Sequence, residues 1–274
     1  MYNVKIIEYP QGYQVKLYDT YLGREDDNKH ENIKDDNIQE LERDCWYSSK
    51  SSFEEIFEIE EWNNEETKRI SFSRTKKNIY YIARSNVWEW FVTFTISPEK
   101  ADRYDYKECK KKITKWLNNQ KERYAPDLYY LVVPEQHKDG AWHFHGLLGG
   151  CAGLVFSDSG LFTNDKQPIY NIDSYKLGFS TATAVRDTNK VSGYICKYIT
   201  KDLCGVLDGR NRYFVSKGIN RANEYEMLVP WYKFDDLKKG LYDHMTWKKK
   251  ENNGFYDIHY FEVDKEWGEM FERE

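Results

Sequence analysis

Residues 130–148, YLVVPEQHKDGAWHFHGLL, form the most informative stretch of the chain. Two apolar runs flank a short polar segment that contains Gly140, which is the pattern of a β-hairpin. Residues two apart in a strand share a face, so His143 and His145 project together. The stretch therefore predicts a hairpin that presents two imidazoles on one face of a sheet.

The length of the turn decides which residue lies opposite the two histidines. A three-residue loop that ends at Gly140 places Glu135 opposite His143, on the same face as both imidazoles. A two-residue turn instead places Gln136 opposite His143 and sends the carboxylate to the other face. In the first register, Glu135, His143 and His145 make a three-ligand site with open positions, which suits Mn²⁺ or Mg²⁺ and also zinc.

The segments on either side of the hairpin predict a mixed domain. The order strand, helix, hairpin, strand, helix favours an antiparallel sheet with helices packed on it, an α+β sandwich. Residues 149–176 have the pattern of a loop. The expected strands are 88–96, 128–135, 141–148 and 177–185, and the expected helices are 74–84, 106–124 and 187–203.

Residues 188–203, TNKVSGYICKYITKDL, predict a helix with two different faces. One face holds Tyr194, Lys197, Tyr198 and Lys201 at the spacing i, i+3, i+4 and i+7. The other face is apolar and suits packing on the sheet. In one interpretation, the two tyrosines simply cover the core. In the other they are nucleophiles, which need a nearby ammonium and a metal because tyrosine ionises only at about pH 10.

The net charge of −5 hides an uneven distribution of charged side chains. Residues 1–67 carry 7 basic and 18 acidic side chains, residues 68–203 carry 22 and 14, and residues 204–274 carry 12 and 14. The basic segment also contains every candidate catalytic group. A polyanionic substrate requires such a distribution, because binding to phosphates depends on Lys and Arg.

The same boundaries predict three parts of the chain. We expect an acidic N-terminal extension at residues 1–67, a core at 68–205 and a C-terminal extension at 206–274 that packs on the core. Within the first part, Val4 to Tyr9 and Tyr13 to Tyr18 flank a turn and predict a hairpin. Residues 23–37 are almost purely polar and predict a mobile linker.

Several classes of protein are disfavoured by what the sequence lacks. No secretory signal and no run of about 18 apolar residues is found, so we expect a cytoplasmic protein without a membrane partner. Five cysteines without a C-x-x-C pair suggest neither a disulfide framework nor a zinc ribbon. The absence of the phosphate-binding glycine motifs disfavours a fused ATP-driven helicase.

Three motifs resemble those of the HUH endonucleases. Trp142 to His145 (WHFH) resembles their His-hydrophobic-His motif, and Tyr194 to Lys201 (YICKYITK) resembles their tyrosine motif. Phe91 to Thr95 (FVTFT) is similar to the first motif of rolling-circle replication initiators. The motifs occur in the family's order within residues 70–205, and the doubled Tyr-x-x-x-Tyr resembles two-tyrosine initiators (Rep) of the bacteriophage and plasmid type.

The resemblance implies a fold and a set of residue roles. The fold is α+β, a five-stranded antiparallel sheet with flanking helices in an HUH or RRM-like palm, here with N- and C-terminal extensions. The implied ligands of a divalent metal (Mn²⁺ or Mg²⁺) are Glu135, His143 and His145, the implied nucleophiles are Tyr194 and Tyr198, and the groups that stabilise charge on the phosphate are Lys197 or Lys201.

The implied function is site-specific nicking and rejoining of single-stranded DNA or an origin hairpin, which initiates rolling-circle replication. One tyrosine attacks a phosphodiester to give a 5′-phosphotyrosine and a free 3′-OH, which a host polymerase extends with the help of a host helicase. The second tyrosine can cut the regenerated DNA. The candidates for holding the DNA are Arg74, Lys76, Lys77, Arg84, Thr93 and Thr95.

Three alternatives remain open on the sequence. An HUH transposase or mobilisation relaxase has the same site but different DNA ends. A non-catalytic single-stranded nucleic-acid-binding domain uses an RNA-recognition-like sheet with Trp88, Trp90 and Phe94 as stacking platforms. A zinc hydrolase acts through metal-bound water, so its cleavage survives replacement of both tyrosines by Phe.

Overall fold

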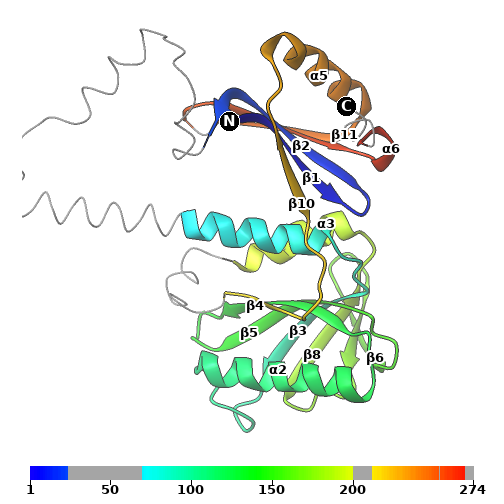
Figure 1. The fold of residues 1–274 in the computed structure, drawn as a ribbon. Coiled ribbons are helices and arrows are strands. Elements are labelled where there is room, and N and C mark those ends of the chain that lie inside the picture. The colour runs from blue at the N-terminus through cyan, green and yellow to red at the C-terminus, as the bar shows by residue number, and fades with distance from the viewer. Residues whose placement is uncertain (24–69, 200–211, 253, 269–274) are drawn as a thin grey trace, which may run out of the picture. The chain divides into compact units, whose positions relative to one another are not determined.

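The computed structural model describes residues 1–23, 70–199, 212–252 and 254–268 (Figure 1). The chain forms two compact units, one from Met1–Asn64 with Asn223–Glu274 and one from Glu65–Ala222. The second unit contains the three motifs. Lys201, the end of the expected helix at 187–203 and the expected linker from residue 24 on lie outside the described residues.

A seven-stranded antiparallel sheet forms the centre of the second unit, in the order β6-β7-β8-β3-β5-β4-β9. Figure 1 shows α2 on one face of this sheet, and α3 with the helix of residues 70–84 on the other. The elements are β3 (Trp90–Ile96), α2 (Tyr106–Arg123), β4 (Tyr129–Gln136), β5 (Trp142–Gly149), β6 (Phe156–Phe162), β7 (Pro168–Ile172), β8 (Gly178–Ala184), α3 (Thr188–Ile195) and β9 (Phe214–Val215).

The central strand β3 separates the core from the motif residues by simple alternation. Val92, Phe94 and Ile96 are buried, and the ring of Phe94 packs against Trp116 of α2 with a centroid distance of 5.2 Å. Burial of each such side chain contributes about 1.5–3 kcal/mol to folding. Thr93 and Thr95 therefore lie on the opposite face, which is the face that α3 covers in part.

The helix α2 begins where the sequence offers a capping residue. The side chain of Asp105 accepts hydrogen bonds from the backbone N–H groups of Lys107 and Glu108, which have no partner within the helix. The apolar residues of the helix recur near the 3.6-residue period and are buried. The expected helix at 106–124 is thereby confirmed to within one residue.

The core sheet differs from the single five-stranded sheet that the family resemblance implies. Two of its extra strands, β6 and β7, occupy the segment that the sequence predicts to be a loop, so that prediction is wrong. Most residues of β6 (FSDSGLF) are exposed, so the strand lacks the alternation of apolar and polar residues that marks a half-buried strand. Pairing with β7, which no local pattern reveals, gives it its extended form.

The helix expected at residues 187–203 is shorter than predicted. α3 ends at Ile195 and continues as a 3₁₀ helix (Cys196–Tyr198), and Ile199 has extended backbone angles. Ile195 and Ile199 are buried as the predicted packing face requires. The change of helix type alters how the two tyrosines face each other, because a 3₁₀ turn has three residues rather than 3.6.

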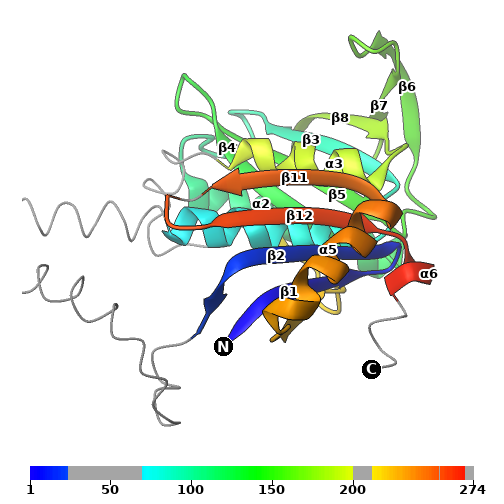
Figure 2. The same cartoon turned by 90° about the horizontal axis from the view of Figure 1, so that it is seen from above.

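The two ends of the chain form a separate antiparallel sheet, in the order β10-β1-β2-β12-β11 (Figure 2). The expected N-terminal hairpin is confirmed, and α5 packs on one face of the sheet through Phe234 and Leu241. The sequence did not predict that the C-terminal segment shares a sheet with this hairpin. The elements are β1 (Tyr2–Tyr9), β2 (Gly12–Leu22), β10 (Asn223–Met227), α5 (Trp231–His244), β11 (Met245–Asn252), β12 (Asp257–Val263) and α6 (Lys265–Gly268).

Membrane-spanning helices were also sought in the described part of the chain. None of its helices combines the length and the apolar character needed to cross a bilayer.

Candidate functional site

The hairpin β4–β5 has the three-residue loop rather than the two-residue turn. The backbone N–H of His137 donates to the carbonyl of Ala141, and that of Gly140 donates to the carbonyl of His137. Gly140 has a φ of 87°, in the left-handed region. As a result Glu135 is the cross-strand partner of His143, which confirms the register that brings the carboxylate to the face of the imidazoles.

We expect replacement of Gly140 by Ala to lower the free energy of unfolding by about 1–2 kcal/mol, the cost of a left-handed conformation for a residue with a Cβ. An added Cβ would meet only the Tyr104 ring at 3.5 Å, an ordinary contact, so backbone strain is the main cost. Urea unfolding measures the difference. Lys138→Ala in the same loop is the matched control, and equal stabilities of the two variants would contradict the expected strain.

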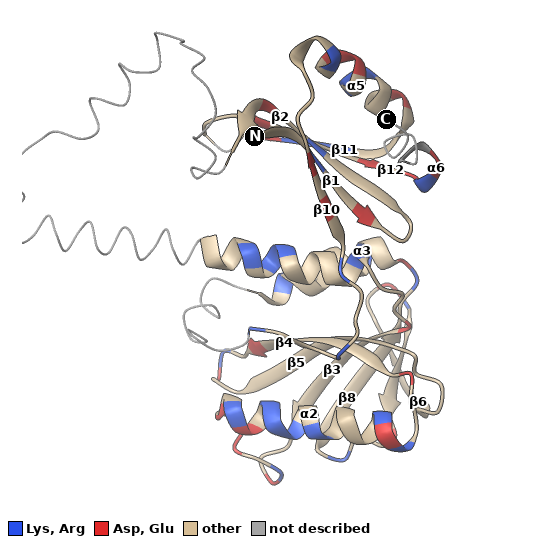
Figure 3. Cartoon of the chain, in the orientation of Figure 1, with Lys and Arg blue, Asp and Glu red and all other residues tan. Residues whose placement is uncertain are grey.

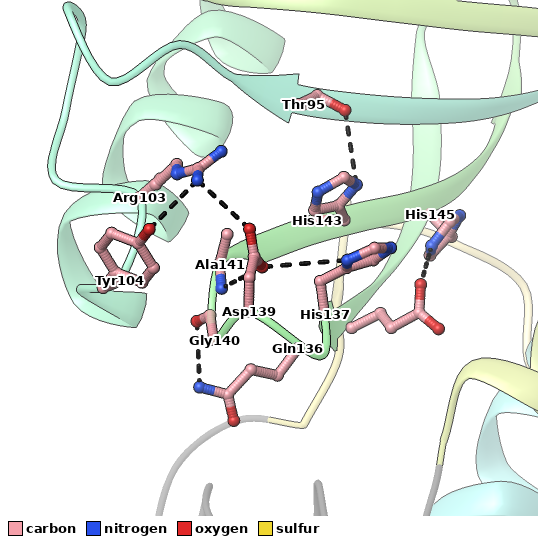
Figure 4. Close-up of polar contacts among 11 residues, drawn as sticks. Thr95, Arg103, Tyr104, Gln136, His137, Asp139, Gly140, Ala141, His143 and His145 are labelled. Atoms are coloured by element: carbon pink, nitrogen blue, oxygen red, sulfur yellow. Dashed lines mark hydrogen bonds and ion pairs between the residues drawn. The ribbon is translucent and has the colours of Figure 1, made fainter.

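Each candidate metal-binding histidine is held by a threonine of the neighbouring strand β3. Thr93 pairs with His145 and Thr95 with His143 in the sheet register. The Oγ1 atom of Thr93 lies 3.1 Å from Nδ1 of His145, and Oγ1 of Thr95 lies 3.5 Å from Nδ1 of His143 (Figure 4). This arrangement turns the Nε2 atom of each ring away from β3, as in histidines that bind a metal through Nε2.

Glu135 completes the polar group on this face. Its Oε2 atom lies 2.7 Å from Nε2 of His145, which is only 8% exposed in its side chain. The hydrogen bond from His145 is the main reason that the pKa of the Glu135 carboxyl is lowered. Burial is the main reason that the pKa of His143 is lowered, which favours its neutral form. An ionised carboxylate and a neutral imidazole are the forms that bind metals.

The fit of a divalent ion to these residues is partial. Within the described residues, no three His, Cys, Asp or Glu side chains are gathered as ligands of one ion. The Nε2 atom of His145 and the Glu135 carboxylate are bonded to each other instead. Two donors on adjacent positions of an ion stand about 3 Å apart, so the separation of 2.7 Å is close to that of a chelating pair. The donor types and the supporting threonines fit the ion, whereas closure of His143 onto it is not seen.

The turn residue His137 lies beside this group. Its side chain is 59% exposed, and its ring stacks on that of His143 with a centroid distance of 4.9 Å (Figure 4). Asp139 in the same loop forms an ion pair with Arg103 at 3.2 Å. These contacts fix the position of the loop, and the exposure of His137 is that of a solvated turn residue.

Both tyrosines lie at the histidine pair. The ring of Tyr198 stacks on the imidazole of His145, with a centroid distance of 3.6 Å and an interplanar angle of 14°. The hydroxyl of Tyr198 donates a hydrogen bond of 3.1 Å to the hydroxyl oxygen of Tyr194. The structure therefore brings two residues of the tyrosine motif to the candidate metal ligands, although the motifs are some 50 residues apart.

The environments of the two hydroxyls differ. Tyr194 is 44% exposed, and Nζ of Lys197 lies 4.8 Å from the centroid of its ring. Tyr198 is half-buried. Burial, the hydrogen bond to Tyr194 and the negative charge of Glu135 raise the pKa of the Tyr198 hydroxyl well above its usual value. The environment of Tyr198 therefore favours a neutral donor.

Phe91 is a site residue that the sequence analysis did not single out. Its ring lies 5.2 Å from that of Tyr194 and 6.1 Å from that of Tyr198, measured between centroids. It lies two residues before Thr93 on β3, on the same face of the strand. The alternation of this strand was the available signal, because it places Phe91 on the face of the histidines.

The candidate DNA-binding residues on the helix of residues 70–84 are not equivalent. Arg74 and Lys76 are exposed and Lys77 is half-buried, with its Nζ 5.1 Å from the centroid of the Tyr81 ring. Arg84 is only 6% exposed, which disfavours direct contact with DNA. Figure 3 shows that many basic side chains of this unit lie on α2, on the opposite face of the sheet from the tyrosines.

The aromatic residues proposed as stacking platforms occupy the core instead. Trp88 is 3% exposed and Phe94 is fully buried. Trp90 stacks on Phe156, with a centroid distance of 4.1 Å. Trp88 and Phe94 therefore cannot stack with bases, because the side chains that the binding-domain alternative requires on the surface form the interior of the domain.

Comparison with known families supports a replication protein. Residues 89–203 match a family model of replication-associated proteins, the ORF2 family. The match spans β3 to α3 and includes Glu135, His143, His145 and both tyrosines, but it covers less than half of the chain. Searches of curated proteins and of solved structures found no match. The similarity is consistent with a rolling-circle replication initiator.

Proposed function

We propose that this chain is an HUH endonuclease with two tyrosine nucleophiles, a metal-dependent DNA nickase and strand transferase that initiates rolling-circle replication. The supporting observation is the stack of Tyr198 on His145, with the Tyr194 and Tyr198 hydroxyls 3.1 Å apart. The similarity of residues 89–203 to replication-associated proteins supports the role in replication.

The reaction is a transfer of a phosphoryl group between two oxygens. The tyrosine gives up its proton, and its oxygen forms a bond to phosphorus while the bond from phosphorus to the 3′ oxygen breaks. The departing 3′ oxygen takes up a proton and becomes a free 3′-OH. The new ester, a 5′-phosphotyrosine, retains the energy of the phosphodiester, so attack by a 3′-OH can rejoin strands without ATP.

The side chains around the two hydroxyls assign the first attack to Tyr194. Its oxygen accepts the hydrogen bond of Tyr198, and the ammonium of Lys197 lies above its ring. Both contacts stabilise a negative phenolate oxygen. Tyr198 would have to ionise in a half-buried position near the Glu135 carboxylate, which opposes a second negative charge. Tyr198 is therefore proposed as the donor in the first step and the nucleophile in the second.

Glu135, His143 and His145 are the residues that would hold the divalent metal, Mn²⁺ or Mg²⁺. Bound there, the ion supplies Lewis-acid polarisation of the phosphate. Thr93 and Thr95 orient the imidazoles in the metal-free protein, and Glu135 supplies the negative charge. The proposed substrate is single-stranded DNA or an origin hairpin, the proposed partners are a host helicase and a host polymerase, and the proposed compartment is the cytoplasm.

Incubation of the full chain with single-stranded DNA and Mn²⁺ tests the proposal. We expect an adduct that resists SDS and carries the DNA through its 5′ phosphate, together with a free 3′-OH on the released piece. A non-catalytic binding domain gives no adduct, and a zinc hydrolase gives cleavage without an adduct. Either outcome, for DNA that contains the origin of the parent element, would contradict the proposal.

A further inference from the structure

A cavity of about 740 Å³ opens beside the two tyrosines. Tyr194 and Tyr198 line one wall together with Phe91. The tip of the β6–β7 hairpin lines the opposite side, and β8 contributes Thr181 and Thr183 between them. Its volume lies within the range of about 300–1,000 Å³ that is typical of small-molecule sites.

The charges around the cavity do not suit a phosphate. Two acidic and two basic side chains line it, so its formal charge is balanced. The carboxylate of Asp187 caps α3 by accepting from the backbone N–H groups of Asn189 and Lys190. It therefore occupies the helix terminus where an anion would otherwise bind, and Nζ of Lys190 lies 3.8 Å from it. A neutral ligand fits these surroundings better than a phosphate does.

The remaining lining residues suit a flat, neutral, hydrogen-bonding ligand. Phe91 and Ile169 offer apolar surface, while Asn164 and Gln167 each offer an amide with both a donor and an acceptor. Side-chain amides and aromatic rings are the groups with which proteins recognise unpaired bases. Because the tyrosines form one wall, such a base would belong to a nucleotide next to the scissile phosphate.

We infer that this cavity holds one base of single-stranded DNA beside the scissile phosphate, and that Asn164 and Gln167 at the β6–β7 tip select which base enters. The inference rests on the proposed function and names the sequence-reading part of that site. Figure 2 shows the β6–β7 hairpin projecting from the end of the sheet.

The hairpin tip is well enough ordered to discriminate between bases. The backbone N–H of Thr163 donates to the carbonyl of Gln167 at 2.8 Å, and that of Lys166 donates to the carbonyl of Thr163 at 2.9 Å. The hydroxyl of Thr163 accepts from the backbone N–H of Gln167 at 3.1 Å. The backbone thus fixes the turn, and removal of the amide side chains of Asn164 and Gln167 leaves these bonds intact.

The test is the cleavage of a pool of single-stranded DNA with randomised sequence by the full chain with Mn²⁺. Sequencing of the DNA joined to the protein gives the base preference at each position around the break. We expect a preference at one position next to the break, which falls about tenfold in Asn164→Ala or Gln167→Ala. Asn118→Ala, an exposed amide on α2, is the matched control and keeps the wild-type preference. Melting temperatures of the variants verify that they fold.

An unchanged preference in both hairpin variants overturns the inference while the proposed function stands, and so does an adduct that shows no preference beside the break. If the wild-type chain forms no adduct, the proposed function fails and binding decides the question of the cavity. Fluorescence anisotropy then compares short oligonucleotides of each base. A preference that both variants lose supports the cavity as a base site, and equal binding by all proteins overturns it.

Discussion

Replacement of Tyr194 by Phe lowers the rate of the first DNA adduct by a factor on the order of a thousand or more, the expected loss for a nucleophile without a substitute. The change removes one oxygen and retains the ring, which packs at 5.2 Å from Phe91. Folding is therefore expected to be nearly unaffected. The loss would be chemical, because the exposed hydroxyl that faces the cavity is gone.

Replacement of Tyr198 by Phe has a smaller expected effect on the first cleavage. The ring can still stack on His145, but the hydrogen bond to the Tyr194 oxygen is lost. Such a bond contributes about 0.5–1.5 kcal/mol, which corresponds to roughly tenfold in rate or less. The later transfer of strands requires a second nucleophile, so Tyr198→Phe is expected to stop the reaction after one adduct.

Single-turnover assays with labelled single-stranded DNA separate the two steps. The yield and rate of the first SDS-resistant adduct report Tyr194, and transfer of the adduct to a second strand reports Tyr198. Tyr124→Phe, at an exposed position after α2, is the matched control. A larger loss of the first adduct in Tyr198→Phe than in Tyr194→Phe would reverse the proposed order, and full activity of the double variant would refute the tyrosine mechanism.

The sequence predicted the hairpin because its evidence is local. Apolar runs on both sides of Gly140 define two strands, and the spacing of His143 and His145 puts both on one face in any register. Only the position of Glu135 depended on loop length, since a change of one residue moves it to the other face. The left-handed conformation of Gly140 in the structure resolves that choice.

The features that the sequence could not predict depend on contacts between distant residues. β6 has few buried residues, so its extended form follows from pairing with β7 rather than from a pattern of its own. The pairing of β12 with β2 joins segments more than 200 residues apart. The end of α3 at Ile195 follows from no proline or glycine at that point, and we have no local explanation for it.

Replacement of Glu135 by Gln is the second change with a large expected effect. Gln keeps the shape of the side chain and can still hydrogen-bond His145, but it lacks the negative charge that attracts a divalent ion. We expect Mn²⁺ affinity to fall by about 10- to 100-fold or more, and the rate of adduct formation at limiting Mn²⁺ to fall with it. Calorimetric titration of the full chain with Mn²⁺ measures the affinity without reference to activity.

Two further variants distinguish loss of a ligand from loss of packing. His145→Ala removes both a donor and the surface on which Tyr198 stacks, so we expect it to lower metal affinity and adduct formation together. His137→Ala removes an exposed imidazole of the same loop and serves as the control, with nearly unchanged Mn²⁺ binding. Retention of wild-type affinity by both Glu135→Gln and His145→Ala would place the metal elsewhere.

Excess Mn²⁺ gives the same variants a second, independent reading. If Glu135 acts only through the ion, saturation with Mn²⁺ restores much of the activity of Glu135→Gln, because the bound state is then populated despite the weaker affinity. Tyr194→Phe responds to no concentration of metal, since its missing oxygen is the atom that forms the bond. Rescue of one variant and not of the other would therefore assign Glu135 to metal binding and Tyr194 to bond formation.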